Sequence, residues 1–208
     1  MITLAIPKGR LLEKLAPRLR GVGFSDDALD ERDRRLLRSN RDESARLLLL
    51  KPDDVPTYVE HGAADAGVVG RDVLLERNAN VFVPHDLGIG RCRLAVAAPV
   101  GQRDARREGR VLRVATKYPT ITTAHFAAKG EEVEVIYLGG SVEIAPLVGL
   151  ADCIVDIVET GETLRQNGLE VIETVCDVSA VTVANRVSMK LQRAALQALL
   201  DALSTEPR

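Results

Sequence analysis

The stretch that decides the fold is Asp152-Cys153-Ile154-Val155-Asp156-Ile157-Val158-Glu159-Thr160-Gly161-Glu162-Thr163-Leu164. Its first half, Cys153–Val158, is short and rich in β-branched residues, which is typical of a strand buried on both faces. A Thr-Gly-x-Thr turn follows, and residues 163–167 then indicate a helix that ends at Gly168. A buried strand that leads through a glycine turn into a helix is the repeating unit of α/β proteins.

The same alternation continues on both sides of this stretch. The pattern predicts strands at 3–6, 66–69, 93–98, 112–115, 133–138, 171–175 and 181–184, and a hairpin of 34–37 with 45–51. It predicts helices at 11–19, 52–60, 71–77, 119–129, 142–150 and 188–203. Such alternation indicates an α/β fold with mainly parallel sheets. We expect two lobes, one formed by residues 1–90 with 180–208 and the other by residues 91–179.

Composition excludes several classes of protein. The chain of 208 residues has 28 Lys and Arg against 30 Asp and Glu, a net charge of −2, which argues against a nucleic-acid-binding protein. No apolar run approaches a membrane span and no secretory signal is visible, so we expect no membrane segment. The three cysteines are scattered, which indicates a reducing cytoplasm. The three histidines are far apart and do not suggest a transition-metal site.

The turn after 153–158 is the strongest candidate for a binding site. Free N–H groups at a helix start, with the hydroxyls of Thr160 and Thr163, could bind a phosphate group, and Gly161 would let it approach the backbone. Alternatively, one of the threonines only caps the helix. Asp156 lies in mid-strand, where an unpaired carboxylate is costly. It either faces a ligand, such as a ribose diol or a Mg²⁺-held sugar hydroxyl, or accepts a structural hydrogen bond from a neighbouring amide.

Three further loops follow predicted strands. In Gly139-Gly140-Ser141-Val142-Glu143, Ser141 suits a helix cap, and Glu143 lies in the first turn or faces the same ligand as Asp156. In Pro7-Lys8-Gly9-Arg10, two cations flank a glycine, which suits a polyphosphate or an ordinary solvated turn. The loop Thr116-Lys117-Tyr118-Pro119 is likewise either an anion-binding loop or an ordinary turn.

Several blocks together resemble a known enzyme family. The blocks Gly140-Ser141-Val142-Glu143-Ile144-Ala145-Pro146-Leu147-Val148-Gly149-Leu150-Ala151-Asp152 and Asp156-Ile157-Val158-Glu159-Thr160-Gly161-Glu162-Thr163-Leu164 resemble the signature of ATP phosphoribosyltransferases. Residues 5–11, 52–56, 62–67, 92–94 and 113–119 resemble the same family, so the similarity runs from about 2 to 190. One departure is Leu138-Gly139, where the family more often has a larger polar residue.

The resemblance implies a fold and a reaction. Family members have two α/β lobes similar to periplasmic binding proteins, with the active site in the cleft. They bind ATP, 5-phosphoribosyl 1-pyrophosphate (PRPP) and Mg²⁺, and the reaction that they catalyse is the first step of histidine biosynthesis. Adenine N1 attacks C1 of the ribose, pyrophosphate leaves and N1-(5-phosphoribosyl)-ATP forms. A chain that ends at Arg208 resembles the short form, which works with a regulatory subunit similar to histidyl-tRNA synthetase. We also expect at least a homodimer.

The resemblance also implies roles for particular residues. The expected catalytic carboxylates are Glu143 and Asp156. The 5-phosphate of PRPP is expected at Glu159, Thr160, Gly161, Glu162 and Thr163, in the lobe formed by 91–179. ATP and pyrophosphate are expected at Lys8, Gly9, Arg10, Lys51, Thr116 and Lys117, with the ATP side in the lobe that contains the N-terminal loop. Mg²⁺ is expected through the substrate's pyrophosphate, with no protein ligand assigned. The alternative is a ligand-binding module of the same fold without catalysis.

Overall fold

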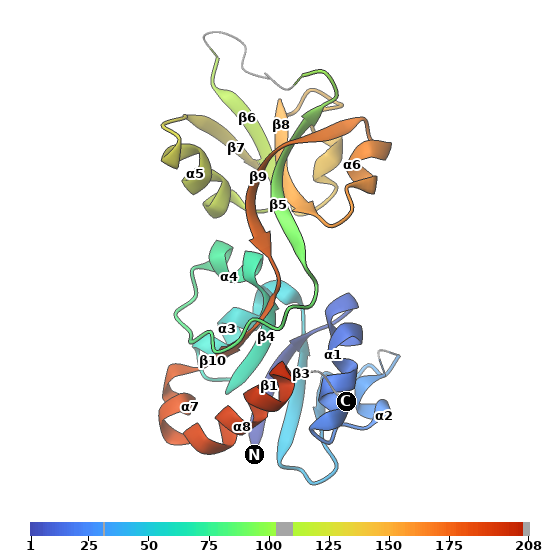
Figure 1. The fold of residues 1–208 in the computed structure, drawn as a ribbon, viewed down its shortest axis with the longest axis vertical. Helices are drawn as coiled ribbons and strands as arrows, with labels where there is room; N and C mark the ends of the chain where they lie inside the picture. Colours follow the sequence, from blue (N-terminus) through green and yellow to red (C-terminus); the bar gives the residue numbers. More distant parts are fainter. Residues whose placement is uncertain (31, 103–109, 206–208) are drawn as a thin grey trace. The chain divides into compact units, whose positions relative to one another are not determined.

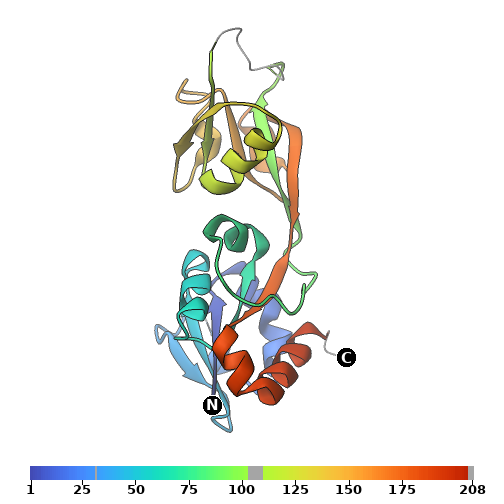
Figure 2. The ribbon, with the colours of Figure 1, turned by 90° about the vertical axis from the view of Figure 1, so that its left-hand side faces the viewer.

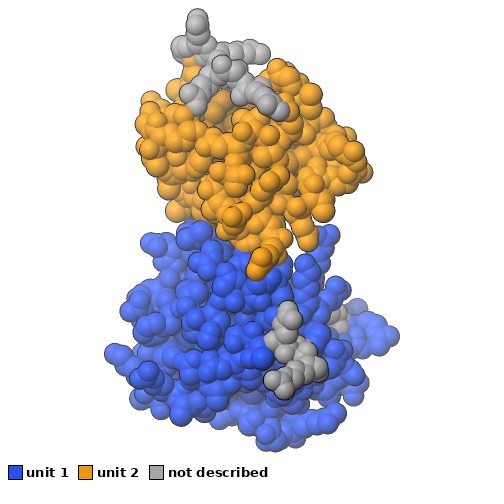
Figure 3. All heavy atoms as spheres, in the orientation of Figure 1, with its two compact units in different colours: residues 1–90, 179–208 blue, residues 91–178 orange. Residues whose placement is uncertain are grey.

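The computed structural model describes residues 1–30, 32–102 and 110–205. The chain forms two compact units, each with its own five-stranded sheet. Unit 1 comprises Met1–Gly90 with Ser179–Arg208, and unit 2 comprises Arg91–Val178 (Figure 3). The α/β fold with two lobes that the sequence predicted is therefore confirmed.

The sheet of unit 1 has the strand order β10-β4-β1-β3-β2. The three central strands, β4 (Ala66–Gly70), β1 (Ile2–Pro7) and β3 (Ala45–Leu50), are parallel. The outer strands, β10 (Ala180–Ala184) and β2 (Leu37–Ser39), are antiparallel to their neighbours. The carboxyl ends of the three central strands therefore meet at one edge of the sheet.

Helices cover both faces of this sheet. On one face, α1 (Arg10–Gly21) and α8 (Arg193–Ser204) pack their leucines on β1 and β3, with α2 (Asp26–Leu29) beside them. On the other face lie α3 (Val55–Glu60), which follows the short helix η1 (Pro52–Asp54), and α4 (Arg71–Arg77). Figure 2 shows α1 and α8 on one side of the sheet and α3 on the other. The remaining helix of unit 1 is α7 (Arg186–Leu191).

The sheet of unit 2 has the order β7-β6-β8-β5-β9. The strands β7 (Val133–Tyr137), β6 (Leu112–Thr116) and β8 (Cys153–Val158) are parallel. The strands β5 (Cys92–Pro99) and β9 (Leu169–Val178) run antiparallel to their neighbours. One face packs on α5 (Pro119–Ala128), and the other on α6 (Glu162–Gln166) and the short helix η2 (Val142–Ile144) (Figure 1).

The expectation of mainly parallel sheets needs correction, because both sheets are mixed. In unit 1 the three central strands are parallel and the two outer strands pair antiparallel with them. In unit 2 the three strands β7, β6 and β8 are parallel, and β5 and β9 at the other side of the sheet pair antiparallel with their neighbours. Burial explains why the sequence could not show this. The segment Leu94–Ala98 of β5 is buried on both faces, so its composition resembles that of a parallel strand. Strand direction is set by the long-range pairing instead.

Two predicted helices also differ in the structure. Residues 142–150 form only η2 and turns, because Pro146 lacks an N–H donor and Gly149 adopts a φ of +71°. Residues 188–203 form two helices with Gln192 between them (φ −127°). Ser188 in α7 donates to Asp65, whereas the leucines of α8 pack on α1, so the two segments serve different partners.

The predicted hairpin forms, but its first strand starts later than expected. The guanidinium group of the buried Arg38 donates to the backbone carbonyls of Ala28, Asp30, Asp33 and Arg35. These bonds hold the backbone before β2 in a loop. Within the described residues, no helix combines the length and the apolar character needed to span a bilayer.

Candidate active site

The carboxyl edge of the unit 2 sheet gathers most of the predicted site residues. Because β7, β6 and β8 are parallel, the loops that follow them meet at this edge. The loop after β6 carries Lys117, the one after β7 leads to Glu143, and the one after β8 contains Thr160 and Gly161. Residues that are far apart in the sequence thus lie at one edge.

The loop after β8 presents polar groups to solvent. Gly161 has a φ of +80° and is the N-cap of α6, without a side-chain capping bond. The hydroxyl of Thr160 accepts a hydrogen bond from the N–H of Glu162 at 3.3 Å. The exposed Thr163 is not the cap, so the capping alternative does not hold for this residue. Among the described residues, nothing accepts a hydrogen bond from the N–H groups of Thr163 and Leu164.

The two glutamates of this loop are placed differently from the threonines. The Glu162 carboxylate pairs with Arg165 and accepts a hydrogen bond from Gln166 at 2.8 Å. Glu159 is exposed, directly after β8. A carboxylate repels a phosphate, so any contribution of these two residues to an anion site comes from their backbone.

Asp156 makes a structural hydrogen bond and also lies near two other charged side chains. Its carboxylate accepts a hydrogen bond from the N–H of Ile157 at 2.8 Å, which is the structural bond considered above. It shares a face of β8 with the core residues Ile154 and Val158 and is half-buried. Burial raises its pKa, and the charge of Glu143 raises the pKa further, whereas Lys117 lowers it. Asp156, Glu143 and Lys117 therefore form one interacting group.

Glu143 reaches this group from η2. It is half-buried, two residues after Ser141, which adopts a φ of +50° that is uncommon for a residue other than glycine. Ser141 occupies the N-cap position, but its side chain makes no capping bond. The expected capping by the Ser141 side chain is therefore wrong.

Thr116 needs a correction as well. Its side chain is fully buried, and its hydroxyl donates to the carbonyl of Val155 at 2.7 Å and accepts from the N–H of Tyr118 at 2.9 Å. No side-chain contact with ATP or pyrophosphate is available to it. Instead, Thr116 ties the loop that carries Lys117 to β8.

A second set of predicted residues gathers in unit 1. Pro7 at the end of β1 pairs with Leu50 at the end of β3, and the N–H of Lys8 donates to the carbonyl of Leu50 at 3.0 Å. Lys8 and Lys51, both exposed, therefore leave neighbouring strand ends. Gly9 adopts φ +86° and ψ −152°, a conformation that favours glycine, and α1 begins at Arg10.

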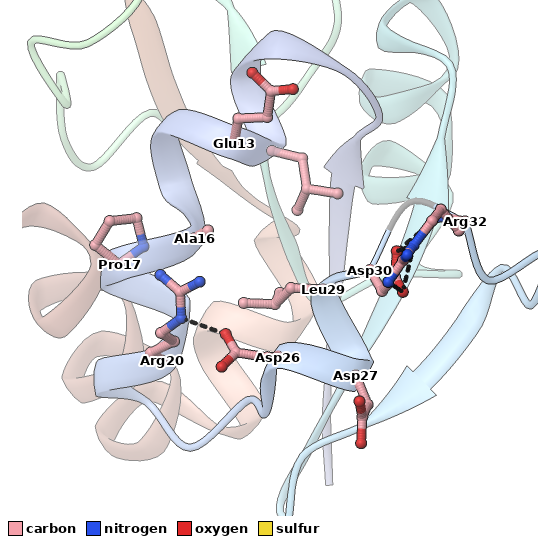
Figure 4. Close-up of a pocket in the computed structure, with 10 residues that line it drawn as sticks. Glu13, Ala16, Pro17, Arg20, Asp26, Asp27, Leu29, Asp30 and Arg32 are labelled. Atoms are coloured by element: carbon pink, nitrogen blue, oxygen red, sulfur yellow. Dashed lines mark hydrogen bonds and ion pairs between the residues drawn. The ribbon is translucent and has the colours of Figure 1, made fainter.

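A pocket in the described part of unit 1 lies away from these residues. It has a volume of about 540 Å³ and lies beside α1 and α2 (Figure 4). Its four carboxylates outnumber its two arginines, which are paired as Arg20 with Asp26 (2.6 Å) and Arg32 with Asp30 (2.8 Å). This excess of negative charge does not suit a polyphosphate, and none of the predicted site residues lines the pocket.

Metal binding by protein side chains alone finds no support in the described residues, where no group of three or more His, Cys, Asp or Glu could hold an ion. The interacting carboxylates of Asp156 and Glu143 are two oxygen donors of the kind that Mg²⁺ shares with substrate phosphates.

One cation at this edge is absent from the predicted site residues. Arg93 in β5 pairs in register with Val158, the last residue of β8. The block Cys92-Arg93-Leu94 resembles the family and could have pointed to Arg93. The antiparallel pairing that brings Arg93 to the loop, however, is visible only in the tertiary structure.

Comparison with known proteins identifies the family. A family model described as "HisG: ATP phosphoribosyltransferase" matches residues 51–205. The chain belongs to this family. An ATP phosphoribosyltransferase of Sorangium cellulosum is 54% identical over 202 residues, which cover 97% of this chain and 94% of the relative. Membership of the ATP phosphoribosyltransferase family confirms the resemblance and the enzyme class that the sequence predicted.

Solved structures agree with this assignment. A structure titled "ATP phosphoribosyl transferase (HisG:HisZ) complex from Thermotoga maritima" has a TM-score of 0.85 and 39% identity, and covers 98% of this chain and 96% of that one. The alkanesulfonate-binding protein SsuA of Xanthomonas axonopodis pv. citri, bound to MOPS, has a TM-score of 0.55 at 12% identity, covering 97% of this chain and 71% of its own. This second likeness concerns the fold alone and supports the predicted similarity between the ATP phosphoribosyltransferase family and binding proteins.

Proposed function

We propose that this chain joins N1 of the adenine of ATP to C1 of PRPP, giving N1-(5-phosphoribosyl)-ATP and pyrophosphate, the first step of L-histidine biosynthesis. The observation that carries the proposal is the grouping of Asp156, Glu143 and the Thr-Gly-Glu-Thr loop at one sheet edge. It occurs in a chain that is 54% identical to a named ATP phosphoribosyltransferase.

In this proposal the loop after β8 holds the 5-phosphate of PRPP. The N–H groups of Thr163 and Leu164 and the hydroxyls of the two threonines are the donors. The positive φ of Gly161 turns the chain so that these groups follow one another around the phosphate. Glu159 and Glu162 contribute backbone only.

The carboxylates act on the ribose. When the bond between C1 and the pyrophosphate oxygen breaks, the electron pair of this bond goes to the leaving pyrophosphate. Positive charge therefore develops at C1. Asp156 and Glu143 stabilise that positive charge, and Asp156 also accepts hydrogen bonds from the ribose hydroxyls. Adenine N1 forms the new bond to C1, and a weak nucleophile of this kind depends mainly on positioning.

The cations act on the phosphates. Lys8, Arg10, Lys51 and Lys117 stabilise the negative charge of ATP and of the departing pyrophosphate, and Gly9 lets the backbone of the first loop approach them. Asp156 and Glu143 are the carboxylates that would hold a metal ion, for which we propose Mg²⁺, and the ion would supply positive charge against the departing pyrophosphate.

The proposal includes partners and a location. A solved relative that covers 98% of this chain is a HisG:HisZ complex. We infer that this chain also works in a hetero-oligomer with a regulatory subunit similar to histidyl-tRNA synthetase, and that it forms at least a homodimer. A cytoplasmic location fits the three cysteines, which are all free thiols.

The direct test is an activity assay. The purified chain is incubated with ATP, PRPP and Mg²⁺, with and without the regulatory subunit, while the ultraviolet absorbance of the adduct is followed. Adduct formation is expected, together with release of one pyrophosphate per adduct. Binding of PRPP without any adduct under either condition would favour the ligand-binding module.

Thr163→Val is expected to weaken PRPP binding by about tenfold to a hundredfold, the cost of one charge-assisted hydrogen bond of roughly 1.5–3 kcal/mol. The melting temperature should stay nearly unchanged, because Gly161 rather than Thr163 caps α6. Calorimetric titration with PRPP and a thermal melt measure both quantities. Unchanged binding with a lower melting temperature would assign Thr163 a structural role.

Lys8→Gln is expected to raise the KM for ATP by about tenfold or more, because an exposed cation at the end of β1 no longer meets the phosphates. Lys190→Gln is the matched control, since Lys190 is an exposed lysine of α7 in the same unit. Steady-state kinetics with ATP as the varied substrate make the comparison. Equal KM values in the two variants would remove Lys8 from the site.

A further inference from the structure

Arg93 lies beside the loop proposed to hold the 5-phosphate. In the sheet of unit 2 it pairs with Val158 of β8 on one side and with Asp177 of β9 on the other. Val158 directly precedes the loop that begins at Glu159. Arg93 therefore stands next to the point where the chain leaves the sheet to form this loop.

The alternation of side chains places Arg93 on the same face as Asp156. Ala95 and Ala97 of β5 belong to the core on the α6 side, whereas Leu94 and Val96 belong to the core on the α5 side. Arg93 shares the face of Ala95, because side chains two residues apart in a strand point the same way. Ala95 pairs with Asp156, so Arg93 is the diagonal neighbour of this carboxylate.

The Arg93 side chain is exposed and unpaired. Among the described residues it has no hydrogen-bond or ion-pair partner, although Asp177 stands directly across from it in β9. Two other arginines of unit 2 are engaged: Arg113 pairs with Asp152 at 2.9 Å and Arg165 pairs with Glu162. Its guanidinium group is thus available to a ligand at this edge.

The charged side chains around the loop after β8 indicate why a phosphate bound there would require this arginine. Four carboxylates lie on or near the loop: Glu143, Asp156, Glu159 and Glu162. Lys117 interacts with Asp156, and Arg165 is held by Glu162. A phosphate dianion that enters the loop therefore needs a further cation, and an arginine offers a planar fork that matches phosphate oxygens.

We propose that Arg93 binds the 5-phosphate of PRPP, together with the loop of residues 159–163. The assignment rests on the proposed function and adds to it the cation that compensates the charge of this phosphate.

The test compares Arg93→Gln and Arg93→Lys with the matched control Arg110→Gln. Arg110 is an exposed arginine of unit 2 that precedes β6, at the opposite edge of the sheet. Binding of ribose 5-phosphate and of inorganic pyrophosphate is measured by calorimetry, and the KM values for PRPP and ATP by steady-state kinetics. Thermal melts report folding.

Arg93→Gln is expected to weaken ribose 5-phosphate binding and raise the KM for PRPP by about tenfold to a hundredfold, the loss of one charge-assisted contact. Pyrophosphate binding, the KM for ATP and the melting temperature should not change. Arg93→Lys should fall between the wild type and Arg93→Gln, because it keeps the charge but loses the fork. Arg110→Gln should behave as the wild type.

Equal ribose 5-phosphate affinity in Arg93→Gln and Arg110→Gln would overturn the proposal. A loss of pyrophosphate binding alone would also overturn it, since it would place Arg93 at the leaving group. If the wild type binds neither ribose 5-phosphate nor PRPP and forms no adduct, the proposed function fails, and this assignment fails with it.

Discussion

Replacing Asp156 by asparagine is expected to lower turnover by about a hundredfold or more, the order of effect of removing one preorganised electrostatic group from an active site. Asparagine has nearly the same shape and still accepts the hydrogen bond from Ile157, but it cannot offer a negative charge to the developing cation at C1. Steady-state kinetics measure the loss. Unchanged turnover would remove Asp156 from the site.

The same substitution should leave the melting temperature unchanged or raise it. Burial raises the pKa of Asp156 above 3.8 in the folded protein, so ionising this carboxylate opposes folding. Its stability cost is absent below pH 3.8 and develops as the pH rises from there through the raised pKa. Thermal melts from pH 3 to 7 should therefore show the wild type losing stability relative to Asp156→Asn across this window. A lower melting temperature for the variant at pH 7 would indicate a structural role.

Asp152 is a control for Asp156, because its pKa is shifted in the opposite direction. Its hydrogen bond with Arg113 lowers the pKa of this carboxyl below 3.8, despite the opposing effect of partial burial. Its contribution to stability is therefore fully present above pH 3.8 and is lost as the pH falls through the lowered pKa. Asp152→Asn should lower the melting temperature at pH 7 and leave turnover nearly intact, because Asp152 precedes β8 at the far edge from the site.

Gly161→Val is expected to reduce kcat/KM for PRPP by about a hundredfold or more. A β-branched residue is strained at a φ of +80°, so the loop must change its path and displace the N–H donors of α6. A displacement of about 1 Å in a positioned group can cost a hundredfold in rate. Kinetics with PRPP as the varied substrate measure the effect.

Gly168→Val is the control that distinguishes the effect of backbone strain from the effect of a displaced phosphate loop. Gly168 also has a positive φ, +68°, and follows the same helix at its other end, with no atom close to an added Cβ. Both variants should lose a similar stability, about 1–2 kcal/mol. Only Gly161→Val should lose affinity for PRPP. Equal kinetic losses in the two variants would show that the strain, rather than the phosphate loop, is responsible.

The pattern of apolar and polar residues along the sequence was sufficient to predict most of the secondary structure. The strand Cys153–Val158 and the helix Arg71–Arg77 were predicted with the bounds that the structure has, because a short buried run and an amphipathic turn are recognisable locally. The prediction of a single C-terminal helix over 188–203 was wrong, because the chain breaks at Gln192 and the two segments meet different partners: Ser188 donates to Asp65, and the leucines of α8 pack on α1. Contacts of that kind leave no local pattern.

The same division holds for the candidate site. The sequence by itself identified Asp156, Glu143 and the Thr-Gly-Glu-Thr loop, because a carboxylate in an apolar strand and a glycine turn before a helix are unusual enough to be noticed locally. Only the tertiary structure shows that the Thr116 hydroxyl is bonded to Val155 and Tyr118, and that antiparallel pairing places Arg93 beside the loop. Chemical type is a property of each residue, whereas burial and strand register arise from segments far apart in the chain, and these decide which side chains are free to meet a ligand.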